Sequence, residues 1–161
     1  QCEGEFEEGN LFKGKIYDDD SGNIKYEGRF ENGLLHGQGK SYYSDGSLQD
    51  EGEYKDNKLN GQGKKYNGIH LIAEGEFKDN KLNGQGKEYL NGRLYYEGEF
   101  KDNDRSGQGK EYLAGRLYYE GEFKNDRLNG QGKKYDYGEV LGYEGEYKDG
   151  KGHLVAIPSG N

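Results

Sequence analysis

The sequence contains little of the material from which most folded cores are built. Of its 161 residues only 29% are hydrophobic, 16 residues are tyrosine, and methionine and tryptophan are missing. It has no apolar run near the roughly 18 residues of a membrane span and no secretory hydrophobic segment, which predicts a soluble chain. Because no initiator methionine is present, we expect a fragment or a processed form. We then expect the chain to be cytoplasmic or, if an upstream signal was removed, exported.

Cysteine and histidine are too scarce for a cross-linked fold. The single cysteine, Cys2, excludes an internal disulfide framework, and His36, His70 and His153 lack the close spacing of zinc ligands. We therefore expect neither a metal site nor a cofactor. Cys2 has two interpretations, an inert thiol on a frayed end or a lipidated cysteine exposed by cleavage.

Positive charge is also in short supply. The chain has 23 basic and 31 acidic residues, a net charge of -8, and its lysines are interleaved with glutamates. This balance argues against nucleic acid as a partner and makes anionic membrane lipid a poor one. What the chain has instead is glycine, 30 residues of it, which suggests turns and close backbone approach rather than disorder.

A repeat of 23 or 24 residues organises the sequence. The tetrapeptide Glu-Gly-(Glu/Arg)-(Phe/Tyr) is followed ten residues after its first glutamate by Gly-Gln-Gly-Lys, then by a tyrosine and a turn glycine. A fixed period of this kind indicates a repeat architecture. The tetrapeptide begins at Glu3, Glu27, Glu51, Glu74, Glu97, Glu120 and Glu144.

Each repeat is predicted to form a β-hairpin. Asp102-Asn103 and Asn91-Gly92 are residue pairs that tolerate positive φ, so they predict two tight turns per repeat. The facing of the return strand 84–89 stays open, because its glycines and its tyrosine have opposite parity unless a bulge intervenes. On the first strand, alternation places Leu94, Tyr96, Gly98 and Phe100 on one face and Tyr95, Glu97, Glu99 and Lys101 on the other.

The expected fold is all-β, a single-layer twisted antiparallel sheet of tandem hairpins. Strand glycines would leave room for aromatic rings to lie across the neighbouring strand. One array fills residues 1–161, with six full repeats starting near residues 3, 27, 51, 74, 97 and 120. The truncated seventh unit and an end cap occupy residues 143–161, the cap being the aliphatic run His153–Ile157 with Pro158 at the last edge.

These residues resemble the MORN repeat. Tyr26-Glu27-Gly28-Arg29-Phe30, Gly37-Gln38-Gly39-Lys40 and Asp45-Gly46 follow its order of Tyr-x-Gly-x-aromatic, Gly-x-Gly and turn glycine. The aromatic position never carries tryptophan, and an extra residue after the turn glycine is similar to variant repeats of bacterial proteins. The resemblance implies hairpin arrays that serve as binding or assembly modules, and it implies no reaction.

Catalytic and ligand signals in the sequence are weak. Glu97 and Glu99 recur in every repeat on a solvated face, whereas a catalytic pair needs one differentiated pocket. The loop Asp18–Asn23 lacks the ligand positions of a calcium loop and is better explained as a widened turn. Gly-Gln-Gly-Lys precedes no helix that could cradle phosphate.

The sequence therefore predicts a non-catalytic scaffold that binds another protein or itself, a homodimer included, through an aromatic face and the sheet edges. The alternative is a ligand-binding module for cell-surface glycan or phospholipid head groups, and an enzyme ranks third. The rings assigned to the partner-binding aromatic face are Tyr26, Phe30, Tyr54, Phe77, Tyr96, Phe100, Tyr119, Phe123, Tyr143 and Tyr147.

Overall fold

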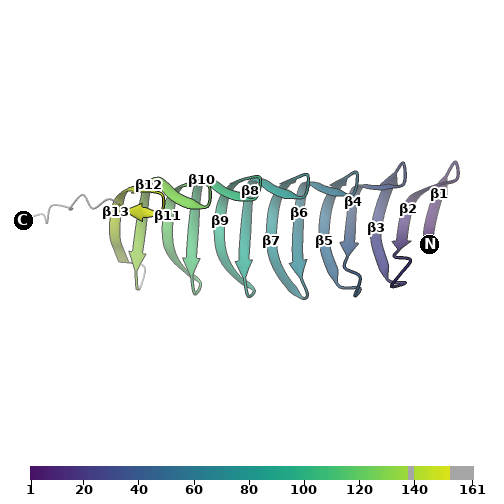
Figure 1. The fold of residues 1–161 in the computed structure, drawn as a ribbon, viewed down its shortest axis with the longest axis horizontal. Helices are drawn as coiled ribbons and strands as arrows, with labels where there is room; N and C mark the ends of the chain where they lie inside the picture. Colours follow the sequence, from purple (N-terminus) through teal and green to yellow (C-terminus); the bar gives the residue numbers. More distant parts are fainter. Residues whose placement is uncertain (138–139, 153–161) are drawn as a thin grey trace, which may run out of the picture.

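The computed structural model describes residues 1–137 and 140–152, and within them the chain is built of strands and turns alone. Strands make up 78% of this part, and it contains no helix. Figure 1 shows them as an elongated, twisted rod. The strands are β1 (Cys2–Glu7), β2 (Asn10–Tyr17), β3 (Ile24–Glu31), β4 (Leu34–Tyr42), β5 (Leu48–Lys55), β6 (Lys58–Asn67), β7 (His70–Lys78), β8 (Lys81–Leu90), β9 (Arg93–Lys101), β10 (Asp104–Leu113), β11 (Arg116–Lys124), β12 (Arg127–Asp136), β13 (Val140–Lys148) and β14 (Lys151–Gly152).

Every strand pairs with the next one along the chain, so the sheet order follows the sequence from β1 to β14, and all pairs are antiparallel. The sheet is open, which confirms the predicted fold class. The cap predicted for His153–Ile157 and Pro158 lies outside the described residues.

Two kinds of turn alternate along the rod. The tip turns close each hairpin, and the link turns join one hairpin to the next; the two kinds lie along opposite long edges in Figure 1. Asp102 and Asn103 form a tip turn with φ values of 52° and 76°, and Asn91 and Gly92 form a link turn with φ values of 51° and 74°. Positive φ at both central residues matches the strand twist, so both predicted turns are confirmed.

The tip turns also fasten neighbouring hairpins to each other. The Asn80 side-chain oxygen accepts a hydrogen bond from the Leu59 N–H at 2.7 Å, and the Asn80 N–H donates to the Leu59 carbonyl at 3.0 Å. We call this pair of bonds the tip latch, a role that the turn chemistry alone did not predict. The same latch joins Asn57 to Leu35, Asn103 to Leu82 and Asp126 to Arg105.

A line of paired glycines crosses the sheet in mid-strand from β1 to β13, and we call it the glycine seam. Gly75, for example, lies opposite Gly63 on one side and Gly86 on the other. The remaining members are Gly4, Gly14, Gly28, Gly39, Gly52, Gly98, Gly109, Gly121, Gly132 and Gly145.

The core lies on one side of the sheet, the core face, with most of its side chains between the seam and the tip turns and Tyr96 on the link-turn side of the seam. A Cβ added to Gly86 would lie 3.0 Å from a methyl of Leu82 and 3.2 Å from the Phe100 ring, so this glycine makes room for both side chains, as predicted for the ring. Leu82 reaches the seam because each hairpin carries a register shift just beyond its tip. The buried core side chains are Leu11, Phe30, Leu35, Tyr54, Leu59, Phe77, Leu82, Tyr96, Phe100, Phe123, Leu128 and Tyr147.

A second register shift, between β8 and β9, changes which side chains of β9 share a face, and so corrects the prediction. Between β8 and β9 the pairing moves from Glu88 with Tyr96 to Tyr89 with Leu94, which leaves Tyr95 as the extra residue of a bulge. Tyr95 therefore packs against the core beside Tyr96, and the prediction that Leu94 shares the face of Tyr96 is wrong. The return strand keeps its alternation between these positions, so its Gly86 faces the core while Tyr89 points to the opposite side.

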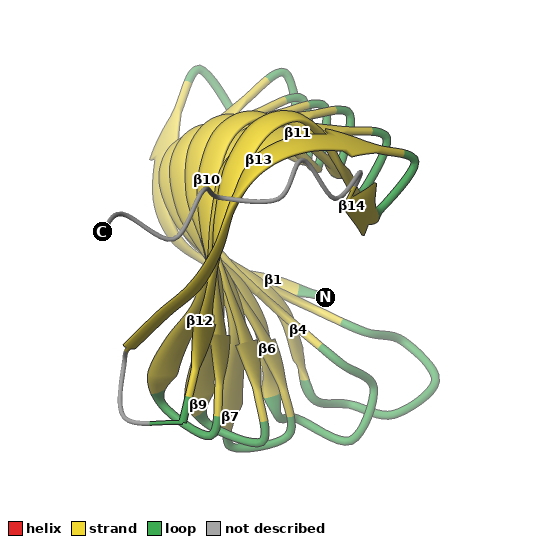
Figure 2. Cartoon of the chain, turned by 90° about the vertical axis from the view of Figure 1, so that its left-hand side faces the viewer, coloured by secondary structure: helices red, strands yellow, loops and turns green. Residues whose placement is uncertain are grey.

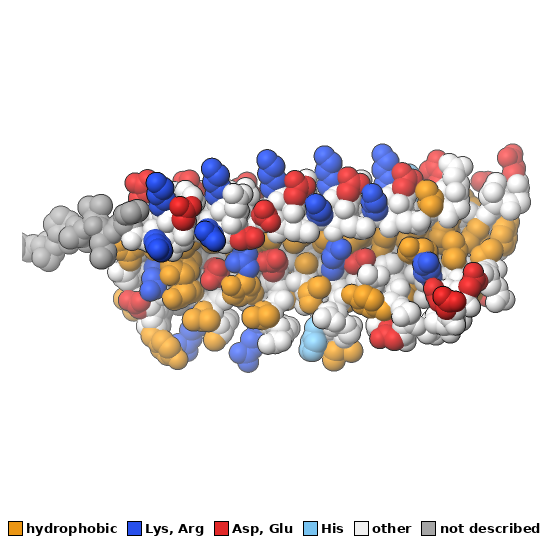
Figure 3. All heavy atoms as spheres, viewed as in Figure 1, with side chains coloured by type: hydrophobic (Ala, Val, Ile, Leu, Met, Phe, Trp, Pro, Cys, Tyr) orange, Lys and Arg blue, Asp and Glu red, His pale blue; other side chains and the backbone are white. Residues whose placement is uncertain are grey.

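The strands bend as well as twist. Seen end-on in Figure 2, they curve into an arch above a narrow waist and fan out below it. Figure 3 shows a continuous apolar band along one side of the rod. A single layer can therefore build its own core, because the bent hairpins fold leucines and rings over the seam.

Candidate functional site

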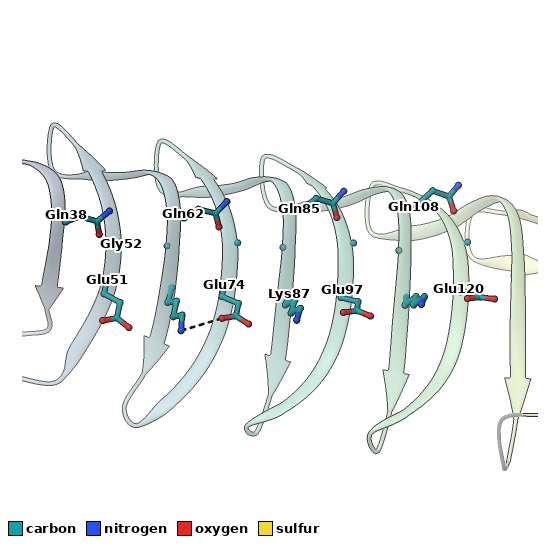
Figure 4. A pocket seen from close by; sticks show the side chains of 18 of the residues that line it. Gln38, Glu51, Gly52, Gln62, Glu74, Gln85, Lys87, Glu97, Gln108 and Glu120 are labelled. Carbon is teal, nitrogen blue, oxygen red and sulfur yellow. Dashed lines mark ion pairs between the residues drawn. The ribbon is translucent and has the colours of Figure 1, made fainter.

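A groove runs lengthwise over the glycine seam on the side opposite the core, which we call the groove face. It extends from Glu27 in β3 to Glu144 in β13 and encloses about 1110 Å³. Its floor is the line of paired glycines, drawn between the flanking side chains in Figure 4. The side chains next to each glycine form the walls, so the floor is backbone that a bound molecule can approach closely.

The two walls of the groove repeat the same polar groups. Figure 4 shows the glutamines on the side of the tip turns and the lysines and glutamates on the side of the link turns. Two strands at about 4.8 Å each advance the pattern by about 10 Å per repeat. The wall residues are Gln38, Gln62, Gln85, Gln108 and Gln131, Lys40, Lys64, Lys87, Lys110 and Lys133, and Glu27, Glu51, Glu74, Glu97, Glu120 and Glu144.

Tyrosine hydroxyls hold the glutamates of the wall in place. The Tyr112 hydroxyl donates to the Glu97 carboxylate at 2.6 Å, and Tyr66 does the same to Glu51 at 2.6 Å. The glutamates predicted to be free in solvent are thus hydrogen-bonded and oriented. The other four pairs of this ladder are Tyr17 with Glu3, Tyr42 with Glu27, Tyr89 with Glu74 and Tyr135 with Glu120.

The ladder predicts a loss of stability at alkaline pH. Burial and the hydrogen bond to a glutamate raise the pKa of Tyr42, Tyr66, Tyr89 and Tyr112 from 10.0 to about 12, and the bond to Glu120 is the larger cause for Tyr135. The folded chain then holds these protons more tightly than the unfolded chain, so this stabilisation is complete below pH 10 and is lost between about pH 10 and pH 12.

Two measurements check this expectation. Tyrosinate absorbance should show a group of tyrosines ionising near pH 12, and the melting temperature should fall steeply over the same range. Replacing Tyr89 and Tyr112 by phenylalanine should flatten that fall. A melting temperature that stays level up to pH 12 would contradict the ladder.

Lysines bring the glutamate wall close to neutrality. The Lys64 ammonium lies 3.7 Å from the Glu74 carboxylate, and Lys133 lies 3.9 Å from both Glu120 and Glu144. These lysines remain substantially exposed, so each pair adds little to stability. Their effect is on recognition, because a charge-balanced wall offers no excess charge of either sign to a polyanion or a polycation.

Most of the predicted aromatic face is core. Phe30, Tyr54, Phe77, Tyr96, Phe100, Phe123 and Tyr147 are each at most 5% exposed. Tyr26, Tyr119 and Tyr143 are half-buried and pack against them. The rings meet edge to face, as Tyr96 does with Phe100 and Phe123 at centroid distances of 5.2 and 5.1 Å. Whether any of the ten contacts a partner stays a prediction, and three of them present accessible surface for it.

The fifth hairpin departs from the others. Arg105 stands where its sisters carry a core leucine, and its guanidinium lies 4.6 Å from the Tyr95 ring centroid and 4.7 Å from that of Tyr96. It pairs with Glu88 at 2.9 Å and Glu111 at 3.2 Å, and its side chain is only 13% exposed. This cluster was not predicted from the sequence, although the change from Lys-Leu-Asn to Asp-Arg-Ser at this position of the repeat marks it.

The loop Asp18–Asn23, the other candidate site, is arranged as a turn and not as a ligand site. Asp18 accepts hydrogen bonds from the backbone N–H groups of Asp20 and Ser21, which lowers its pKa and closes the widened turn. Residues 1–137 and 140–152 contain no cluster of three His, Cys, Asp or Glu side chains arranged to hold a metal ion. No helix of this part of the chain is long and apolar enough to cross a membrane.

Comparison with known proteins agrees with the hairpin pattern. The MORN repeat matches six times, at residues 26–48, 51–68, 74–92, 96–115, 119–137 and 143–153. A comparison with curated proteins gives no significant match. The likeness to bacterial variant repeats stays an expectation. MORN repeats are a non-catalytic repeat type and generally act as scaffolds for interaction with proteins or membranes. With matched repeats over more than half of its length, this chain belongs to the MORN repeat family.

Proposed function

We propose that this protein is a non-catalytic scaffold that holds an extended segment of another protein along the groove face. The observation that carries the proposal is the groove itself, which runs uninterrupted from β3 to β13 with the same polar groups at each repeat. A ligand that suits it must be long, narrow and able to use hydrogen bonds at regular intervals.

An extended polypeptide has these properties. The glutamine amides of one wall can donate to peptide carbonyls and accept from peptide N–H groups. Three residues of extended chain span about 10 Å, which is the advance of the groove per repeat. The balanced pairs of lysine and glutamate favour a segment of mixed or low charge, and the glycine floor allows its backbone to lie close.

The half-buried rings of the core face provide a second contact region in this proposal. Tyr26, Tyr119 and Tyr143 each present part of a ring beside the core. Such rings suit an interface because they offer an apolar surface and a hydroxyl. They lie on the opposite side of the sheet from the groove, so substitutions can separate the two surfaces.

A peptide selection tests the groove. Random 15-residue peptides displayed on phage are the probe, selected against the purified chain and then measured singly by calorimetry. We expect Gln85→Ala with Gln108→Ala to weaken their binding by more than tenfold, because two adjacent wall amides are lost. The matched control is Lys101→Ala with Lys124→Ala, two exposed side chains beside the tip turns, which should change binding little.

Two results would overturn the groove as the binding site. In the first, the glutamine variant binds as well as the wild type while Tyr26→Ser with Tyr119→Ser abolishes binding, which would move recognition to the core face. In the second, no peptide is selected, whereas a glycan array or liposomes of phosphatidylcholine and phosphatidylserine retain the chain. That result would favour the glycan or head-group alternative. Circular dichroism of each variant verifies that the sheet is intact.

A further inference from the structure

One wall of the groove carries a line of hydrogen-bonding groups that the chain itself leaves unused. The wall glutamines, which we call the glutamine row, are all exposed, and none of their amides has a hydrogen-bond partner within residues 1–137 and 140–152. Figure 4 shows members of the row in line along the tip-turn side of the groove. The row consists of Gln38, Gln62, Gln85, Gln108 and Gln131.

The carboxylates of the opposite wall are already occupied by the chain. Glu74 accepts a hydrogen bond from the Tyr89 hydroxyl, and the Lys64 ammonium lies 3.7 Å from the same carboxylate. Of the described residues that line the groove, the glutamines alone carry side chains that can both donate and accept hydrogen bonds. A ligand therefore meets one free amide per repeat, always on the same side of the groove.

This spacing discriminates between the conformations that a bound polypeptide can adopt. Two strands at about 4.8 Å each separate successive amides of the row by about 9.6 Å. In an α-helix the backbone groups bond to one another and are not free for the row. In an extended strand, residues three apart point to opposite sides, and residues on one side are about 6.6 or 13 Å apart. Polyproline II instead points every third residue the same way, at intervals of about 9.3 Å, which agrees with the row.

We propose that the groove binds a polyproline II segment of another protein, one turn per repeat, with the glutamine row holding every third residue of the segment. This inference rests on the proposed function and names the conformation of its ligand. A glutamine amide can donate to the carbonyl and accept from the N–H of one ligand residue. Polyproline II leaves both of these groups unbonded along its length. The two spacings differ by about 0.3 Å per repeat, or about 1 Å over the whole row.

The sequence class of the ligand follows from these contacts. The residue that meets the row needs its N–H, so it is not proline. The two residues between such contacts need no N–H, and proline there favours polyproline II before binding, both in itself and in the residue that precedes it. Ordering the segment in advance reduces the entropy that binding costs. The ligand is therefore proline-rich, with a polar residue other than proline at every third position.

Two peptides of identical composition test the period. The triplet peptide is five Pro-Pro-Gln units, with glutamine at positions 3, 6, 9, 12 and 15. Its isomer has ten prolines and glutamine at positions 3, 5, 9, 11 and 15. All five glutamines of the triplet peptide share one face of polyproline II, whereas those of the isomer share one side of an extended strand. We expect calorimetry with the 161-residue chain to show about tenfold tighter binding of the triplet peptide, because the isomer can place only three glutamines on the row.

A double substitution in the row makes the prediction sharper. Gln62→Ala with Gln108→Ala leaves Gln38, Gln85 and Gln131, whose amides are two repeats apart. Both peptides can reach these three amides with positions 3, 9 and 15. The triplet peptide should therefore bind this variant about tenfold more weakly than the wild type, the isomer should bind both alike, and the preference between the peptides should disappear.

Gln49→Ala is the matched control, because Gln49 does not line the groove, and it should leave both affinities unchanged. Circular dichroism should show the same sheet in all variants. The proposal is wrong if the isomer binds the wild type as tightly as the triplet peptide, or if the double variant keeps the preference.

It is also wrong if neither peptide binds while phage-selected peptides do. In each of these cases the proposed function stands as long as the selected peptides lose affinity when Gln85 and Gln108 are replaced. Failure of the proposed function would instead appear as selected peptides that ignore that replacement.

Discussion

Replacing Gly75 by alanine should break the rod into two parts that unfold separately. Gly75 lies in the middle of β7 with a φ of 143°, a conformation that side chains rarely adopt. A Cβ there would lie 2.3 Å from the Gln85 carbonyl oxygen and 2.5 Å from the Gly86 Cα, both in the backbone of the paired strand. No rotamer can relieve such a contact, so β7 and β8 must separate.

The expected loss of stability is more than about 3 kcal/mol, which places the substitution among the most damaging single changes. Because each hairpin contacts its neighbours alone, the damage stays local and the two sides of the array melt independently. Urea denaturation followed by circular dichroism should therefore change from one transition to two.

Gly115→Ala is the matched control. Gly115 also has a positive φ, 80°, but no atom lies within 4 Å of the position of its added Cβ. It should cost about 1 kcal/mol, the conformational term alone. If the two variants lose equal stability, the close approach of strands at the seam does not limit the side chain at Gly75.

Asn80→Gly should show how much the tip latch contributes to coupling between hairpins. Glycine accepts the φ of 68° at this position, so the substitution removes the side-chain acceptor without straining the turn. The Leu59 N–H then loses its partner at the base of a fully buried side chain. An unpaired donor in such a place costs about 1–3 kcal/mol, and we expect a loss in that range.

Two further substitutions separate the turn from the latch. Asn80→Asp should retain most of the stability, because Asp126 makes the same bond to the Arg105 N–H at 2.8 Å. Asn80→Ala should be worse than Asn80→Gly by about 1 kcal/mol, since it adds strain at positive φ. Urea denaturation midpoints give all three values. An aspartate variant as unstable as the glycine variant would mean that the bond adds nothing.

The sequence predicted what depends on near neighbours. Asp102-Asn103 and Asn91-Gly92 specify their turns by their own backbone preferences, and the repeated tetrapeptide specifies the hairpins between them. The need for a glycine beneath a ring also follows from the residue types, and Gly86 beneath Phe100 confirms it.

The burial of the rings depends on bulges and register shifts, which the alternation of residues along a strand does not predict. A period of two assumes an unbroken ladder, but the bulge at Tyr95 moves that residue to the core face and Leu94 away from it. The register shift near each tip brings leucines such as Leu82 over the seam, which covers rings that a flat sheet would leave in water. The groove was missed for the same reason, since it lies over glycines that were interpreted from the core side alone.

The regularity of the groove makes it a lattice rather than a single site. A ligand shorter than the groove meets the same amide, ammonium and carboxylate groups at each of several positions, one repeat apart. These positions have nearly equal energy, so such a ligand can move along the array by steps of about 10 Å without leaving it. Its binding isotherm would then depend on the number of unoccupied positions along the groove. Adding one hairpin to the chain would add one position without changing the contacts at the others.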